Sequence, residues 1–78
     1  MADTTAADVL VRNAGSVWLF CPQTQEALDW IEHNIGEAMY LGRNLVVEHR
    51  YGPNIVIGMR DDALVVEAMK DAVSVFNP

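Results

Sequence analysis

Residues 17–35 read VWLFCPQTQEALDWIEHNI, and this stretch decides the fold class of the chain. It opens with an apolar run that is rich in Val and aromatic side chains, which is typical of a strand. Pro22 and Gln23 then interrupt the run, and Thr24 is suited to accept a backbone hydrogen bond as the N-cap of a helix. The stretch therefore predicts a strand followed directly by a helix that starts at Thr24.

The helix predicted after Thr24 has an apolar side and a polar side. At about 100° per residue, its apolar side collects Ala27, Leu28, Ile31, Ile35 and, if the helix continues, Ala38. The polar side and its margins carry Glu26, Asp29, Trp30, Glu32 and His33. Gly36 is expected to end the regular helix, which places Glu37 after a turn. Such a helix covers a sheet with one side and presents carboxylates to solvent with the other.

Two further segments are predicted to be strands. Val9-Leu10-Val11 precedes the first strand across a short segment that contains Asn13 and Gly15, a pattern typical of a β-hairpin. Residues 45–49, LVVEH, follow a polar turn and are apolar enough for another strand. Together with residues 17–21, these segments predict a short antiparallel sheet.

The second half of the chain leaves helix and strand open in two places. Over residues 51–60 an apolar residue recurs at every fourth position and Pro53 suits a first helical turn, which favours a short helix. The β-branched run Ile55-Val56-Ile57 and the turn residues before it favour a hairpin instead. Over residues 61–76 the acid pair Asp61-Asp62 can cap a helix with an apolar stripe, while the first part of this stretch alone fits a strand.

Length and composition limit the architecture to one small domain. The 78 residues carry 11 acidic and 5 basic side chains, a net charge of −6, and 51% of them are hydrophobic. We predict an α+β fold over residues 8–78, in which a short antiparallel sheet packs against two or three helices. Residues 1–7 are small and polar and are predicted to form a flexible leader.

Charge, cysteine usage and hydropathy narrow the cellular setting. A net charge of −6 disfavours direct binding to nucleic acid, which requires basic side chains to neutralise phosphates. The single cysteine, Cys21, cannot form an internal disulfide, as expected in a reducing compartment. The start of the chain lacks the pattern of a signal peptide, and the longest apolar run, residues 17–21, is too short to span a membrane. We therefore expect a cytoplasmic protein.

No motif in the sequence indicates an enzyme. Cys21 with His33 or His49 has the residue types of a thiolate–imidazole pair, but Cys21 ends an apolar strand, where cysteine behaves as a small hydrophobe. The two histidines stand 16 residues apart without a recognised metal-ligand spacing, and the glycines are too scattered for a phosphate-binding loop. We predict a protein with no catalytic, cofactor or metal site.

Residues 13–42 contain no Lys or Arg, and the acids of the predicted helix lie within them. Glu26, Asp29 and Glu32 are spaced by three residues, so neighbours approach on the helix surface and their like charges bring no folding benefit. One interpretation is a solvated face that keeps the protein soluble. The other is a surface for a basic partner, with carboxylates in the positions of nucleic-acid phosphates. The predicted partner-binding residues are Glu26, Asp29, Trp30, Glu32, Glu37 and Tyr40.

Two stretches of the chain resemble known proteins. Residues 21–30, CPQTQEALDW, and residues 45–51, LVVEHRY, resemble small prophage proteins of proteobacteria. As a short, acidic, single-domain chain without a catalytic motif, the protein also resembles anti-CRISPR proteins, in particular those that act on type I-C systems. That resemblance implies a bacterial host cytosol and binding to a Cas protein or to the crRNA-guided surveillance complex. Several acidic anti-CRISPR proteins occupy the DNA-binding channel as DNA mimics, and others block recruitment of the nuclease. Because these proteins share no common fold, no functional residue is carried over from them.

Two functional hypotheses follow from these observations. The first is a non-enzymatic inhibitor that binds a basic surface of a type I Cas surveillance complex, with Trp30 or Tyr40 as an aromatic anchor, and blocks target DNA binding. On the simpler interpretation, both aromatic residues are half-buried core. The alternative function is a small cytosolic adaptor or subunit that docks through apolar surface, either the exposed side of residues 55–57 or the stripe between residues 65 and 76. We expect no direct contact with nucleic acid or membrane, and a monomer rather than a dimer.

Overall fold

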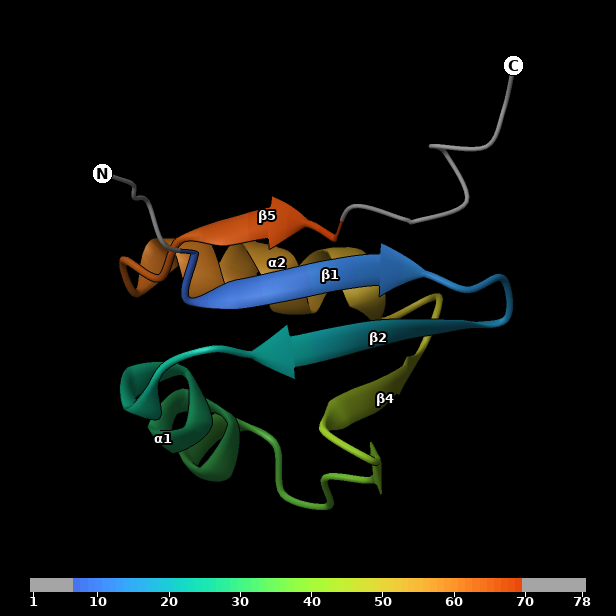
Figure 1. The fold of residues 1–78 in the computed structure, drawn as a ribbon, viewed down its shortest axis with the longest axis horizontal. Coiled ribbons are helices and arrows are strands. Elements are labelled where there is room, and N and C mark those ends of the chain that lie inside the picture. Colours follow the sequence, from blue (N-terminus) through green and yellow to red (C-terminus); the bar gives the residue numbers. More distant parts are fainter. Residues whose placement is uncertain (1–6, 70–78) are drawn as a thin grey trace.

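A computed structural model describes residues 7–69, which form a five-stranded mixed sheet with two helices against one of its faces (Figure 1). The predicted α+β fold is confirmed. Ala7 is 7% exposed, so the folded part reaches into the predicted leader, of which residues 1–6 lie outside the described residues. The elements in chain order are β1 (Val9–Asn13), β2 (Val17–Pro22), α1 (Gln25–Asn34), β3 (Tyr40–Leu41), β4 (Asn44–Glu48), α2 (Gly52–Asp61) and β5 (Val66–Ala68).

The sheet has the strand order β3-β4-β2-β1-β5, and one of its pairs departs from the prediction. The pairs β1–β2, β2–β4 and β3–β4 are antiparallel, but β1 and β5 are parallel, with Val9 opposite Val66. The purely antiparallel sheet predicted from the sequence is therefore wrong at this edge. The reason lies in α2, which carries the chain back to the end of the sheet where β4 began. β5 then runs in the direction of β4, which is also the direction of β1.

The β1–β2 hairpin forms where the sequence predicts it. Its connection places Gly15 at a φ of 94°, a left-handed conformation that glycine adopts without a Cβ clash. The Asn13 side chain stabilises the turn, because its Oδ1 accepts a 2.9 Å hydrogen bond from the backbone N–H of Gly15. The backbone N–H of Ala14 donates to the carbonyl oxygen of Val17 at 2.9 Å. Local turn chemistry therefore sets the register of this strand pair.

Helix α1 starts and ends as predicted. Thr24 is its N-cap, with an extended backbone, and its Oγ1 accepts a 3.2 Å hydrogen bond from the N–H of Ala27. The same hydroxyl donates to Oδ1 of Asp8 at 3.0 Å, which ties the start of the helix to the segment before β1. The helix packs on the sheet through Ala27 and Ile31, which are 0% and 1% exposed. Leu28 was predicted to lie on this buried side but is 39% exposed, because it is rotated about 100° around the helix axis from Ala27. Its side chain lines a groove beside β3.

Of the two alternatives that the sequence left open over residues 51–60, the structure shows the favoured helix, α2. Pro53 occupies its first turn, where a missing N–H costs no helical hydrogen bond. Gly52, at the start of the helix, lies against the indole of Trp18, and a Cβ at this position would collide with the ring. Glycine thus permits the close approach of α2 to β2.

The stretch after α2 is a strand, where the sequence left helix and strand open. Ala63 follows the helix with a φ of 70°, a left-handed conformation that turns the chain out of the helix. The backbone N–H of Val65 then donates to Oδ2 of Asp8 at 2.8 Å, and β5 pairs with β1. A helix capped by Asp61-Asp62 is therefore wrong for this stretch, and the predicted apolar positions between residues 70 and 76 lie outside the described residues.

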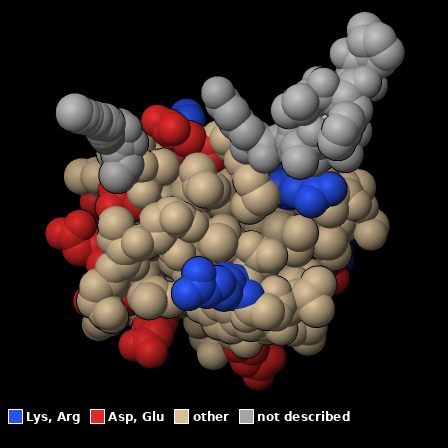
Figure 2. Space-filling view, in the orientation of Figure 1, with Lys and Arg blue, Asp and Glu red and all other residues tan. Residues whose placement is uncertain are grey.

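The core lies between the sheet and the two helices. Its largest fully buried side chains come from both layers and are Val9, Phe20, Ile31, Leu45 and Met59. Successive strand residues alternate between the two faces, so the neighbours of the buried strand residues point to the opposite side of the sheet. No helix of residues 7–69 covers that side (Figure 1). It is mostly uncharged, and acidic side chains gather along its rim (Figure 2).

Candidate protein-binding surface

The acids of α1 point away from the sheet. One side of the helix is buried, so Glu26, Asp29 and Glu32 lie on the remaining, exposed surface. Oδ1 of Asp29 accepts a 3.0 Å hydrogen bond from Nε2 of Gln25, one helical turn earlier. The helix therefore presents its carboxylates to solvent, as the sequence predicts.

Trp30 joins α1 to the end of α2. Its indole Nε1–H donates a 2.6 Å hydrogen bond to Oδ2 of Asp62. Its ring lies over Gly58, where an added Cβ would be 3.2 Å from Cζ2 of the indole. Trp30 is half-buried and packs against the core cluster. The side chain therefore belongs partly to the core and partly to the surface. Its predicted role as an aromatic anchor for a partner is compatible with its position as a half-buried core residue.

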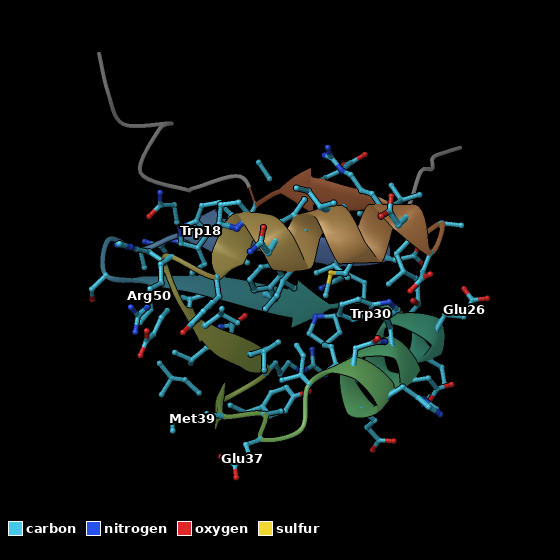
Figure 3. The ribbon with its side chains drawn as sticks, turned by 180° about the vertical axis from the view of Figure 1, so that it is seen from behind. Trp18, Glu26, Trp30, Glu37, Met39 and Arg50 are labelled. Carbon is cyan, nitrogen blue, oxygen red and sulfur yellow. The ribbon has the colours of Figure 1, made fainter. Side chains whose placement is uncertain are left out.

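An open cleft of about 360 Å³ lies beside the Trp30 ring, between α1 and the turn after α2 (Figure 3). The residues that line it include Glu26, Asp29, Trp30, His33, Asp62 and Leu64. Three carboxylates thus border one indole. Carboxylates attract cations, and an aromatic face adds to the binding of an Arg or Lys side chain. The chemistry of the cleft therefore suits a basic side chain of a partner.

Asp62 is the acid of this cleft that the sequence did not indicate as a partner-binding residue. Two adjacent acids before an apolar stripe predict a cap at the start of a helix. In the structure Asp62 is instead the C-cap residue of α2, and its carboxylate accepts the hydrogen bond from Trp30. The two residues are 32 positions apart, so no local sequence pattern connects them.

Two of the predicted acids lie away from the cleft. Glu32 comes six positions after Glu26, which places it about 240° further around the helix axis. Glu37 lies in the turn after α1 and is well separated from Glu26 and Trp30 (Figure 3). The predicted acidic row is therefore divided. Glu26 and Asp29 line the cleft, whereas Glu32 and Glu37 do not.

Tyr40 lies on β3, on the other side of α1. It is 43% exposed and lines a second groove, of about 470 Å³, together with Leu28 and Arg43. The fold therefore brings a cation to α1, although residues 13–42 contain none. Among the described residues that line the Trp30 cleft there is no Lys or Arg. The cleft therefore gathers carboxylates without a described Lys or Arg in its lining.

Cys21 lies on β2, outside the cleft. It is half-buried, and its Sγ accepts a 3.2 Å hydrogen bond from Nε2 of Gln23. Within residues 7–69, no three His, Cys, Asp or Glu side chains are placed to hold a metal ion. Over the same part of the chain, no helix combines the length and the apolar character needed to cross a membrane.

The sequence matches no protein-family model and no curated protein, and the structure matches no solved structure.

Proposed function

We propose that this chain is a non-enzymatic anti-CRISPR inhibitor of a type I Cas surveillance complex. In this proposal the acidic side of α1 binds a basic surface of the complex and takes the place of target DNA. The observation that carries the proposal is the cleft in which Glu26, Asp29 and Asp62 border the indole of Trp30. The resemblance of the chain to acidic anti-CRISPR proteins supports the choice of partner.

Carboxylates can replace phosphates as ligands of a basic channel. Arg side chains that bind DNA phosphates also bind carboxylates with two parallel hydrogen bonds. Trp30 adds an aromatic surface, and tryptophans near the centre of an interface often contribute most of its binding energy. Its hydrogen bond to Asp62 restrains the ring before the partner arrives, which reduces the entropy lost on binding.

The overall charge of the chain supports a protein partner. A net charge of −6 repels nucleic acid and anionic lipid but attracts a basic protein surface. We therefore assign the binding to a Cas protein in the cytosol of the bacterial host, without direct contact to nucleic acid or membrane and without a cofactor.

Charge reversal in the cleft tests the proposal. The Glu26→Lys/Asp29→Lys variant replaces two exposed carboxylates of α1 and changes the net charge from −6 to −2. The Glu37→Lys/Glu67→Lys variant makes the same change in net charge at exposed positions outside the cleft. Inhibition of CRISPR interference should be lost with the first pair and retained with the second. Loss with both pairs, or with neither, would contradict binding through the cleft.

The second candidate function is an adaptor or subunit that docks through apolar surface. The observation that favours it is the exposure of three large apolar side chains, Met39, Leu41 and Ile57, at 68%, 67% and 58%. Of the predicted contact at residues 55–57, only Ile57 is exposed, because Ile55 and Val56 pack against the core. Association that does not change with salt concentration would support this candidate over the inhibitor.

A further inference from the structure

Among the described residues that line the cleft between α1 and the turn after α2, His33 is the one titratable side chain that is not a carboxylate. It lies in the last turn of α1 and shares the lining with Glu26, Asp29 and Asp62. The other histidine of the chain, His49, follows β4 and lines a different groove. A response of the cleft to a histidine proton therefore belongs to His33.

The backbone of α1 determines which nitrogen of the neutral imidazole carries the proton. Nδ1 of His33 lies 2.9 Å from the carbonyl oxygen of Asp29, one helical turn earlier. A carbonyl oxygen only accepts, so Nδ1 is the donor of this hydrogen bond and Nε2 is left as the basic nitrogen. Protonation of Nε2 therefore leaves the hydrogen bond in place and changes only the charge of the side chain.

A proton on His33 changes the charge of the cleft without removing its carboxylates. Histidine ordinarily changes charge between about pH 5 and 8, whereas Asp and Glu ordinarily do so near pH 4. The three carboxylates of the lining give the cleft a charge of −3, and an added imidazolium reduces it to −2. No described Lys or Arg shares this lining, and Glu32, on α1, and Glu37, in the turn after it, lie outside it.

We propose that His33 makes the cleft a pH-dependent binding site, which holds a basic partner less tightly when the imidazole takes up a proton. This inference rests on the function proposed above, because it requires that the cleft bind a cationic side chain. The imidazolium and the partner's cation compete for the same carboxylates, those of Glu26, Asp29 and Asp62. The two equilibria are therefore linked reciprocally: the proton weakens binding of the partner, and the bound partner expels the proton.

The distance between the charges sets the size of the effect. Side chains one helical turn apart, such as those of Asp29 and His33, have their Cβ atoms about 5–6 Å apart. A cation held by the carboxylates therefore comes within a similar distance of the imidazolium. Two unit charges about 6 Å apart in water repel by an amount that corresponds to about a threefold change in affinity. We expect a loss of about this size when the imidazole is fully protonated, and the release of less than one proton for each partner bound.

Calorimetric titration of the full chain with hexa-arginine, acetylated and amidated at its ends, tests the role of His33. The charge of this peptide is constant between about pH 5.5 and 7.5. Wild type should bind it about threefold more weakly at the lower pH, whereas His33→Gln, which cannot take up the proton, should bind nearly equally at both. The matched control, His49→Gln, removes the other histidine and should behave like wild type. In buffers of different ionisation enthalpy near pH 6.5, wild type and His49→Gln should release protons on binding, and His33→Gln should not.

The Glu26→Lys/Asp29→Lys variant separates this inference from the function on which it rests. If wild type does not bind the peptide at the higher pH, or if this variant binds it as tightly as wild type, the cleft holds no cation. Either result would overturn the proposed function together with the inference. If the variant loses the peptide while His33→Gln still weakens at the lower pH as much as wild type, the cleft stands as the binding site and only the role of His33 is overturned.

Discussion

Trp30 and Asp62, 32 residues apart in the sequence, are joined by a 2.6 Å hydrogen bond from the indole nitrogen to the carboxylate. This bond connects the middle of α1 to the residue that ends α2. Both residues line the acidic cleft, and the bond holds the indole ring beside the carboxylates of Glu26 and Asp29. The geometry of the proposed binding surface therefore depends on a contact between two elements that are distant in the chain.

Removal of the Asp62 carboxylate should loosen this junction. Asp62→Ala removes the acceptor of the indole hydrogen bond and should lower the free energy of unfolding by about 1 kcal/mol, because the bond lies at the surface. Asp62→Asn keeps an acceptor oxygen and should lose less. Urea unfolding measures both variants, with Asp61→Ala, an exposed neighbouring acid, as the control. Equal stability of Asp62→Ala and wild type would argue against a structural role for the bond.

The close contact between Gly52 and Trp18 predicts that no residue larger than glycine is tolerated at position 52 without a loss of stability. Gly52→Ala places a Cβ in steric collision with the indole carbons of Trp18 and should lower the free energy of unfolding by about 1–3 kcal/mol. Gly36→Ala is the matched control, since nothing lies within 4 Å of its added Cβ, and it should change stability by less than about 0.5 kcal/mol. Thermal unfolding of the two variants compares them. Similar losses in both would mean that the contact with Trp18 is not the cause.

The Thr24 hydroxyl has two partners, and its removal should weaken the first turn of α1. Thr24→Ala loses the hydrogen bond from the Ala27 N–H and the bond to Asp8, at a cost of about 1 kcal/mol or more. Thr24→Ser retains the hydroxyl and should stay within a few tenths of a kcal/mol of wild type. Hydrogen exchange of the Ala27 amide reports the effect directly. Unchanged protection in Thr24→Ala would contradict the cap.

The parts of the fold that the sequence predicts well are those with local causes. Thr24 carries its capping signal within three residues of the helix that it starts, and the helix is found there. Asn13 and Gly15 supply turn chemistry between two apolar runs, and the hairpin is found there too. In both cases the residues that form the structure are neighbours in the sequence.

The parts that the sequence did not predict depend on distant residues. The parallel pairing of β5 requires knowledge of where α2 returns the chain, which no local pattern contains. Asp62 joins the cleft only because α1 and the end of α2 meet. Arg43 follows the cation-free segment in the sequence, yet it lies in a groove beside the start of α1. The regular three-residue spacing of Glu26, Asp29 and Glu32 suggested one continuous row. Over two such steps, however, the helix turns Glu32 away from Glu26.

Salt concentration should separate the two candidate functions. Binding through the carboxylates of the cleft should weaken between about 0.1 M and 0.5 M salt, because screening shortens the range of exposed charges below about 10 Å. Docking through apolar surface should change little over the same range. Calorimetric titration of the purified chain with the purified surveillance complex provides the measurement. Affinity that is constant across this range would favour the adaptor.

The central claim is that the cleft on α1 inhibits a type I Cas complex, and phage plaquing tests it most directly. Matched bacterial hosts with and without an active type I-C system would each express the wild-type chain or the Glu26→Lys/Asp29→Lys variant. We predict that the wild type restores plaquing only in the host with active CRISPR, and that the variant does not. Plaquing that the wild type leaves unchanged, or that the variant restores equally well, would contradict the claim.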